Sequence, residues 1–347
     1  MKIGVVTVHD SSNFGSILQA FGLKKTLEKM GHDVYFIKTR SRKELYKIFL
    51  GKSKNIKKYF YNKKKYKVFM QDIEEFKEIS LEDIQNKPEL VDLLIIGSDE
   101  LWNVDTPVFR NEYFYGISMK VKRKITYAIS SGSATYERLK NYPNLIQGIK
   151  EIDNIFVRDK LTGENVKKIT GKDPEFTCDP TFLVDISEFK KKYENPIKDK
   201  YLLIYSYSYS EKQKEYIVRY ARENNLKIVS AGLFNSWCDK NINCSPLEFS
   251  EVICGAEAVV TTTFHGTIFS ILNKKQFVSF SGKQKTKDVL EKTNLTDAIF
   301  NEEDSYENFK LHFTKKLDFN EAYNRILSMR EESLEKLRRE LCEEGNL

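Results

Sequence analysis

The sequence predicts an α/β protein made of two doubly wound domains that face each other across a cleft. Short apolar runs alternate with stretches in which apolar residues recur every three or four positions, as in strands and amphipathic helices. This alternation occurs twice, on either side of a charged segment at residues 188–200 that contains Asn195-Pro196. Each series supports its own parallel sheet, and 347 residues suffice for two hydrophobic cores.

The first series opens with a strand at residues 3–8, a helix that ends at Gly31 and a second strand at residues 34–37. This order implies parallel strands joined by a right-handed crossover. Further apolar runs extend the predicted sheet, at residues 93–96, 125–129 and 155–157.

The second series starts with a strand at residues 201–205 and continues through alternating helices and strands to residue 280. Within it, a strand at 258–262 leads into a helix at 266–272. A long polar helix is expected from residue 320 to residue 344. We therefore expect three segments, with the first domain at 1–185, the second at 186–319 and the C-terminal helix at 320–347.

The composition excludes several classes of protein. With 40% hydrophobic and 31% charged residues, the chain is globular rather than disordered. Its five cysteines form no Cys-x-x-Cys pair, which fits reduced thiols better than a disulfide framework or a zinc site. The first apolar run is too short for a signal peptide, and the stretch at 90–96 is far too short to cross a membrane. We expect a cytoplasmic protein.

Residues 40–68 are unusually basic, with twelve Lys or Arg and a single acid, Glu44. Aromatic and aliphatic residues are interleaved with these charges. Such a segment suits an anionic membrane surface or a phosphorylated lipid, at the inner face of the cell membrane. A solvated surface insertion is an equal alternative. Nucleic acid is not expected as a partner, because no binding motif accompanies the charge.

Polar loops follow several predicted strands, and ligands bind at that edge of parallel α/β sheets. Asn13-Phe-Gly15 follows the first strand and lacks a dinucleotide-binding glycine pattern, so Asn13 could equally be a helix N-cap. Gly97 to Asn103 follows the strand at 93–96. A sugar could stack on Trp102 there, with Asp99 or Asn103 bonding its hydroxyls, although a turn with a half-buried Trp is an alternative.

Two more loops have similar positions. Ser130-Ser-Gly132 would let a ligand approach the backbone closely, or it is a flexible turn. Arg158 stands at a strand end, where an arginine suits bidentate recognition of a carboxylate or phosphate. A surface ion pair with Asp159 is the other interpretation.

The strongest candidate is His265, between a strand that ends at Thr262 and a helix that begins near Gly266. It would lie beside exposed backbone N–H groups and the hydroxyls of Thr263 and Thr267. Such a position suits phosphate binding and proton exchange at neutral pH. A metal site is not expected, because no second ligand lies at the required spacing. A serine hydrolase is not expected, because the chain lacks Gly-x-Ser-x-Gly.

Taken in order, these motifs resemble the polysaccharide pyruvyl transferase family. The resembling segments span roughly residues 13 to 282 and comprise 13–20, 97–103, 157–160, 178–181, 245–249 and 261–270. The resemblance implies two Rossmann-like domains arranged as in the B-type glycosyltransferases, with the C-terminal helix crossing back to the first domain.

The resemblance also implies a reaction. Pyruvate from phosphoenolpyruvate is joined to two hydroxyls of a lipid- or nucleotide-linked sugar, giving a cyclic ketal and phosphate with no separate cofactor. His265 is then the general acid/base or an electrophile on the phosphate, and Arg158 holds the donor's phosphate or carboxylate. The residues expected to line the cleft are Asn13, Gly15, Ser98, Asp99, Trp102, Asn103, Ser130, Gly132, Thr263, Gly266, Thr267, Lys283 and Lys285.

Two positions depart from the family pattern. Some members carry Arg two residues before the histidine, where this chain has Thr263, and members often have Ser-Arg where it reads Lys285-Thr-Lys287. If the missing Arg binds the donor in the family, then Arg158, Lys283, Lys285 or Lys287 must bind it in this chain. The alternative is that this chain uses a different donor.

Two other functions stay open at this point. One is a nucleotide-sugar-dependent glycosyltransferase of the same two-domain plan. The other is a non-catalytic relative that binds a glycan or lipid phosphate, with Thr263 marking lost chemistry. The acceptor sugar and the oligomeric state are not predicted.

Overall fold

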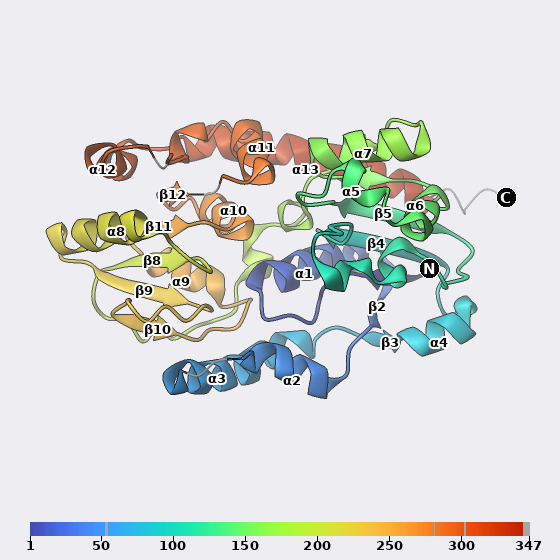
Figure 1. The fold of residues 1–347 in the computed structure, drawn as a ribbon, viewed down its shortest axis with the longest axis horizontal. Coiled ribbons are helices and arrows are strands. Elements are labelled where there is room, and N and C mark those ends of the chain that lie inside the picture. The colour runs from blue at the N-terminus through green and yellow to red at the C-terminus, as the bar shows by residue number, and fades with distance from the viewer. Residues whose placement is uncertain (53–54, 281, 302, 343–347) are drawn as a thin grey trace.

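Two parallel β-sheets form the framework of the protein (Figure 1). The structure is a computed structural model and describes residues 1–52, 55–280, 282–301 and 303–342. The first sheet has the order β3-β2-β1-β4-β5-β6-β7 and the second the order β10-β9-β8-β11-β12. The first comprises β1 (Lys2–Val6), β2 (Asp33–Lys38), β3 (Glu78–Ser80), β4 (Leu93–Asp99), β5 (Lys124–Ile129), β6 (Phe156–Val157) and β7 (Glu175–Phe176). The second comprises β8 (Tyr201–Tyr205), β9 (Lys227–Ala231), β10 (Lys240–Ile242), β11 (Ala258–Thr261) and β12 (Phe277–Ser279).

The central strands are apolar along their length because helices cover both faces of each sheet. In β4 the run Leu93 to Ile96 is buried, and every residue of β8 is buried. The helices of the first half are α1 (Phe14–Lys29), α2 (Arg42–Leu50), α3 (Ile56–Ile73), α4 (Leu81–Asn86), α5 (Tyr136–Leu139), α6 (Pro143–Lys150) and α7 (Lys160–Thr170). The remaining helices are α8 (Glu211–Glu223), α9 (Phe249–Gly255), α10 (Phe264–Leu272), α11 (Gln284–Lys292), α12 (Tyr306–Thr314) and α13 (Phe319–Cys342).

Helix α1 lies at the junction of the two halves (Figure 1). Its first residue, Phe14, stacks on Phe249 with ring centroids 4.4 Å apart and on Tyr205 with centroids 5.5 Å apart. Both partners belong to the second half of the chain. Burial on several sides makes α1 apolar over most of its surface, so it lacks the single stripe of an ordinary surface helix.

Helix α13 crosses back from the second sheet to the first (Figure 1). Near its start, Lys274 Nζ lies 3.4 Å from Asn320 Oδ1, next to α10. Near its end, the guanidinium of Arg123 donates to the backbone oxygen and the carboxylate of Glu340, at 2.5 Å each. Arg123 directly precedes β5, so the helix packs on the first sheet.

The predicted fold is confirmed: both sheets are parallel, and the C-terminal helix returns to the first. Within the basic segment, α2 and α3 form between β2 and β3, and residues 53–54 lie outside the described residues. The same is true of residues 343–347 of the predicted C-terminal segment. Helix α10 begins at Phe264, two residues earlier than expected, because Thr263 caps it. None of the described helices is long and apolar enough to cross a membrane.

Candidate active site

A cavity of about 470 Å³ lies between the two sheets. In the first sheet the order of connection reverses between β1 and β4, and in the second between β8 and β11. A crevice opens beyond the carboxyl ends of strands at such a reversal. Here the two crevices meet, because the cavity is lined by residues that follow all four of these strands and β12. They are Asn13, Ser16, Asp99, Glu100, Phe109, Tyr205, Tyr207, Ser208, Thr262, Thr263, Phe264, His265, Gly282, Lys283 and Lys285.

His265 lies in the first turn of α10, with its imidazole in the wall of this cavity. Thr263 caps the helix by accepting a hydrogen bond from the backbone N–H of Gly266 at 3.0 Å. The ring is nearly buried, and its Nε2 has no hydrogen-bond partner among the described residues. An unsatisfied buried nitrogen is costly, so its persistence points to a functional role.

Gly15 allows His265 to approach α1. A β-carbon placed on Gly15 would lie 2.0 Å from Nδ1 of His265, well inside van der Waals contact. Gly15 stands in the first turn of α1 and His265 in the first turn of α10, so the two helices meet by their N-terminal ends. The sequence prediction that both residues belong to one site agrees with this geometry.

Asp179 joins His265 to Arg158. Its Oδ2 accepts a hydrogen bond from Arg158 Nη1 at 2.7 Å and lies 3.8 Å from His265 Nε2. Its Oδ1 accepts hydrogen bonds from the backbone N–H and the hydroxyl of Thr181. Burial acts to raise the pKa of Asp179, but the nearby imidazole, the Arg158 charge and the Thr181 hydroxyl hold it well below its ordinary range. The carboxylate is therefore ionised and can fix which nitrogen of His265 carries the proton.

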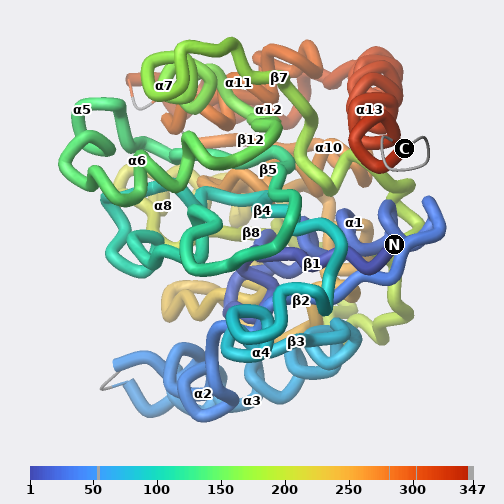
Figure 2. The backbone as a smooth tube through the Cα atoms, turned by 90° about the vertical axis from the view of Figure 1, so that its right-hand side faces the viewer, coloured from blue at the N-terminus to red at the C-terminus, as the bar shows by residue number. Residues whose placement is uncertain are grey.

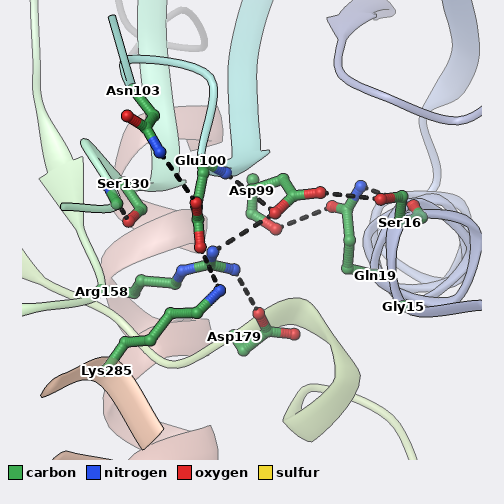
Figure 3. A network of polar contacts seen from close by, with 12 residues as sticks. Gly15, Ser16, Gln19, Asp99, Glu100, Asn103, Ser130, Arg158, Asp179 and Lys285 are labelled. Atoms are coloured by element: carbon green, nitrogen blue, oxygen red, sulfur yellow. Dashed lines mark hydrogen bonds and ion pairs between the residues drawn. The ribbon is translucent and has the colours of Figure 1, made fainter. Parts of the chain in front are cut away.

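Arg158 is buried and is not among the residues that line this cavity. Figure 3 shows its guanidinium bonded to Asp99 and Asp179. The Nη2 of Arg158 lies 3.4 Å from Asp99 Oδ1, and its guanidinium carbon lies 5.0 Å from the ring centre of Phe264. Burial acts to lower the pKa of Arg158, but Asp179 and Asp99 outweigh it and raise the pKa above its ordinary value. The sequence predicts Arg158 as a ligand of the donor. In the structure it pairs with two carboxylates instead.

A second ion pair connects the two domains at the cavity. Lys285 of α11 contacts the carboxylate of Glu100 through its Nζ, which also lies 4.7 Å from the ring centre of Phe264 (Figure 3). Burial acts to raise the pKa of Glu100, but Lys285 and Arg158 lower it to about 2. Glu100 therefore stays ionised at neutral pH.

The start of α1 contributes a third set of polar contacts. Asn13 Oδ1 accepts a hydrogen bond from the backbone N–H of Gly15 at 2.9 Å and another from the Tyr205 hydroxyl at 3.1 Å. The hydroxyl of Ser16 donates to Asp99 Oδ2 at 2.9 Å (Figure 3). Asn13 is thus the cap of α1 and also part of the cavity wall, whereas binding of a ligand by this motif stays a prediction.

Trp102 does not face the cavity, so the predicted sugar stacking on its ring is wrong. The side chain is 1% exposed, its Nε1 donates to the backbone oxygen of Phe114 at 3.0 Å, and its ring lies parallel to Tyr115. The loop after β4 turns Trp102 into the core of the first domain while Asp99 and Glu100 point the other way.

Several other predicted residues support the wall without lining it. Asn103 donates to Glu100 at 3.1 Å, and Ser98 donates to Gln19 at 2.7 Å. Gly132 leaves room for Asn103, because a β-carbon there would lie 2.6 Å from the Asn103 amide nitrogen. Ser130, Gly266 and Thr267 likewise hold local turns and helix geometry, with Ser130 accepting from the Gly132 N–H.

Thr263 faces the cavity, and two lysines stand near it. Lys283 and Lys285 are in the lining, whereas Lys287 is not. Lys283 is exposed. Two lysines, Lys283 at the cap of α11 and Lys285 in its first turn, therefore bring cationic charge to the cavity, and that of Lys285 is paired with Glu100.

The sequence predicted no role for several residues of this site, among them Ser16, Glu100, Phe109, Asp179 and Tyr207. Asp179 and Glu100 lie within segments that resemble the family, so their position in those segments could have pointed to a role in the site. Tyr207 follows β8 and is 64% exposed at the mouth of the cavity. Its position just after a central strand was the available clue.

Among residues 1–52, 55–280, 282–301 and 303–342, no group of three or more His, Cys, Asp or Glu side chains is arranged to hold a metal ion. The five cysteines are free thiols. Burial raises the pKa of Cys178 to about 11, so this thiol, next to Asp179, stays protonated.

Solved structures with the same two-domain arrangement include sugar-nucleotide enzymes. A putative UDP-N-acetylglucosamine 2-epimerase from Listeria monocytogenes superimposes with a TM-score of 0.58 and 12% identity, covering 99% of this chain and 96% of that one. The UDP-GlcNAc 2-epimerase from Methanocaldococcus jannaschii gives 0.55 and 12%, over 92% and 93%. An alpha-glucosyltransferase in complex with UDP gives 0.52 and 12%, over 96% and 95%. At these identities the likeness shows the fold alone, which is that of the B-type glycosyltransferases.

A comparison with curated proteins gave no match. The family model described as polysaccharide pyruvyl transferase matches residues 13–284, from the cap of α1 to the start of α11. That range contains every residue of the cavity lining except Lys285. The chain belongs to the polysaccharide pyruvyl transferase family.

Proposed function

We propose that the protein transfers pyruvate from phosphoenolpyruvate to a sugar of a cell-surface polysaccharide precursor, forming a cyclic ketal and releasing phosphate. The observation that carries this proposal is the unpaired Nε2 of His265, held 3.8 Å from the ionised Asp179 in an interdomain cavity. Pyruvyl transfer is proposed as the reaction because the chain belongs to the polysaccharide pyruvyl transferase family.

The reaction has two steps that balance without an oxidant or reductant. A proton adds to the methylene carbon of phosphoenolpyruvate while the first sugar hydroxyl attacks the central carbon and loses its proton. The second hydroxyl then displaces phosphate from the same carbon, which closes the ketal. Both steps move protons, so a group that donates and accepts protons at neutral pH is required. No redox change occurs, so we expect no separate cofactor.

His265 is the group suited to this work, because a histidine exchanges protons near neutral pH and this one lines the cavity. Asp179 orients the imidazole and stabilises the charge that forms on it, while Arg158 holds Asp179 in place. Arg158 therefore acts as a positioning residue in this proposal.

The cavity has groups that favour an anionic donor such as phosphoenolpyruvate. Asn13 and Thr263, the caps of α1 and α10, both line the cavity, so the N-terminal ends of two helices border it. Helix N-termini favour anions through their dipoles and free N–H groups. Lys283 lines the same cavity and adds positive charge, and Lys285 adds a charge that is shared with Glu100. We assign the phosphate and carboxylate of the donor to this part of the cavity.

The acceptor sugar is assigned to the side lined by Tyr207 and Phe109. Both are aromatic residues of the lining and suit contact with an apolar face of a sugar ring, the role that the buried Trp102 cannot take. The carboxylates of Asp99 and Glu100 lie close by and can accept from sugar hydroxyls.

The test measures phosphate release from phosphoenolpyruvate with and without a panel of acceptor glycans. We expect release only when an acceptor is present, and a loss of about a hundredfold or more in His265→Ala with folding intact. His312→Ala is the matched control, because His312 lies in α12, outside the cavity lining. Unchanged turnover in His265→Ala would remove His265 from the mechanism.

Calorimetric titrations separate the alternatives. Tight binding of uridine diphosphate with no release of phosphate from phosphoenolpyruvate would favour a nucleotide-sugar-dependent glycosyltransferase. Binding of phosphoenolpyruvate without turnover across the acceptor panel would favour a non-catalytic binding protein.

A further inference from the structure

The outer surface of the α2–α3 pair carries a cluster of exposed large apolar side chains. We call this the hairpin surface; its apolar members are Ile48 (45% exposed), Ile56 (69%), Tyr59 (39%) and Phe60 (60%). On α3, Ile56 lies one helical turn before Tyr59 and Phe60, whose rings are 5.6 Å apart, so these three side chains form one patch. Ile48 is exposed on the neighbouring helix α2. Contiguous exposed apolar surface of this kind marks an interaction site.

Lysines surround the apolar patch. On α3, Ile56, Phe60, Lys63, Lys64 and Lys67 lie on one face, since they are spaced by three, four or multiples of a helical turn. All five are exposed. Lys43, Lys47, Lys52, Lys57 and Lys58 are also exposed in this region. Among the ion pairs of the described residues, none involves these lysines; the acids near this region pair elsewhere, Glu74 with Arg42 and Glu78 with Lys38. Glu44, the acid of α2, feels the charge of Lys47 without forming an ion pair with it.

The opposite face of α3 is fixed to the body of the protein. Tyr61 donates to the backbone oxygen of Ile242 at 2.9 Å, which ties the helix to the second domain. Lys65 Nζ donates to the backbone oxygen of Ser12 at 2.5 Å, and Phe69 stacks on Phe14 with ring centroids 5.0 Å apart. The helix is therefore held against the loop that begins α1, and its outer face is a fixed surface of the molecule.

We propose that the hairpin surface binds an anionic lipid bilayer. Apolar side chains in one patch, flanked by unpaired lysines on a helix that lies flat on the protein, match the interfacial region of a membrane with negative headgroups. Nucleic acid explains the lysines but gives no use to the exposed aliphatic chains of Ile48 and Ile56. α2 and α3 lie side by side along one edge of the molecule in both views, so a flat surface can reach both (Figure 1 and Figure 2).

The inference extends the proposed function in one respect. If the acceptor is a lipid-linked sugar, docking through α2 and α3 holds the cavity close to the membrane that carries it. That consequence rests on the proposed function, whereas binding to a bilayer does not. The two can therefore fail separately.

The test is co-sedimentation of the full chain with vesicles of phosphatidylcholine alone or mixed with phosphatidylglycerol. We expect binding to the anionic vesicles, weakened by high salt, and little binding to the neutral ones. Neutralising three charges with Lys63→Gln, Lys64→Gln and Lys67→Gln is expected to weaken binding about a hundredfold. Ile56→Ser with Phe60→Ser is expected to weaken it by at least about tenfold.

The matched controls lie on helices or loops other than α2 and α3. Lys150→Gln, Lys168→Gln and Lys172→Gln remove the same charge from the region of α6 and α7, and Val218→Ser with Leu327→Ser removes exposed apolar side chains elsewhere. Both control sets should bind vesicles like the wild type. All variants should keep wild-type phosphate release with a water-soluble acceptor, which keeps this test distinct from that of the catalytic proposal.

Three outcomes would overturn the inference. In the first, the wild-type protein does not bind anionic vesicles. In the second, the hairpin-surface variants and the control variants weaken binding equally. In the third, the protein binds duplex nucleic acid as tightly as vesicles, and the loss of Ile56 and Phe60 does not change that binding.

Discussion

Gly15 and His265 share a space that only a glycine leaves open. The imidazole of His265, from the second domain, occupies the volume where any other residue at position 15 would place its β-carbon. The position of the proposed proton-transfer group thus depends on the absence of a side chain in the other domain. Substitution of a residue that carries no functional group should therefore disable the enzyme.

We predict that Gly15→Ala lowers kcat for pyruvyl transfer by about tenfold or more, because the added methyl displaces His265 and a small misplacement of a catalytic group is costly. In the His265→Ala background the same change should have little further effect, since the clash is gone. A double-mutant cycle on phosphate release measures this coupling. Additive losses would show that Gly15 acts independently of His265.

We predict that Asp179→Asn destabilises the protein by about 3–5 kcal/mol, because it leaves the buried guanidinium of Arg158 without its nearest carboxylate. Activity should fall as well, since His265 loses the charge that orients it. Urea denaturation gives the first value and phosphate release the second. Asp185→Asn is the control, because the Asp185 carboxylate is an exposed cap whose replacement by Asn costs less than about 1 kcal/mol. A fully stable Asp179→Asn protein would contradict the assignment.

We predict opposite behaviour for two aromatic residues. Trp102→Phe should cost about 1–3 kcal/mol of stability, because it leaves the backbone oxygen of Phe114 without its donor, and should leave the KM for the acceptor unchanged. Tyr207→Ala should raise that KM with little effect on thermal unfolding, because its ring is largely exposed. The reverse pattern would return Trp102 to the sugar site.

The fourth prediction concerns pH. Burial lowers the pKa of Lys65 from its ordinary 10.5 to about 7. Between these values the unfolded chain holds a proton on Lys65 that the folded chain has lost, so the free energy of unfolding rises with pH in this window. Below about pH 7 both states are protonated, and the full cost of the buried charge remains.

Lys65→Met should remove this dependence. Relative to the wild type, the variant should be more stable at pH 7, and its stability should rise less steeply from pH 7 to pH 9, by up to about 1.4 kcal/mol per pH unit. Denaturant titrations at several pH values test this. Lys64→Met, which changes an exposed neighbour, should keep the wild-type slope.

Much of the fold could be predicted because strand and helix periodicities are local. The strand at 93–96 and the helix that follows Asn13 can be predicted without knowledge of the rest of the chain. The site could be predicted only in part. Strand-end motifs place Asn13, Asp99 and His265 at the right edge, but they do not determine which way each side chain points.

That direction is set by partners far along the sequence. Trp102 turns inward because Phe114 offers it an acceptor, and Arg158 turns away from the cavity because Asp99 and Asp179 meet it behind the wall. Asp179 follows β7 and lies 3.8 Å from His265, which belongs to a helix of the second domain. No local sequence pattern predicts that these two residues meet.

Helix α13 has a consequence for how the chain is made. The first sheet is complete in sequence by residue 176, yet Arg123 and Asn154 bond to Glu340, and Arg330 donates to the backbone oxygens of Phe182 and Val184. During synthesis, therefore, the side chains of Arg123 and Asn154 and the backbone oxygens of Phe182 and Val184 lack these hydrogen-bond partners until α13 has left the ribosome. A nascent chain stalled before residue 319 would expose the surface that α13 covers to chaperones and proteases, even if its strands had already paired.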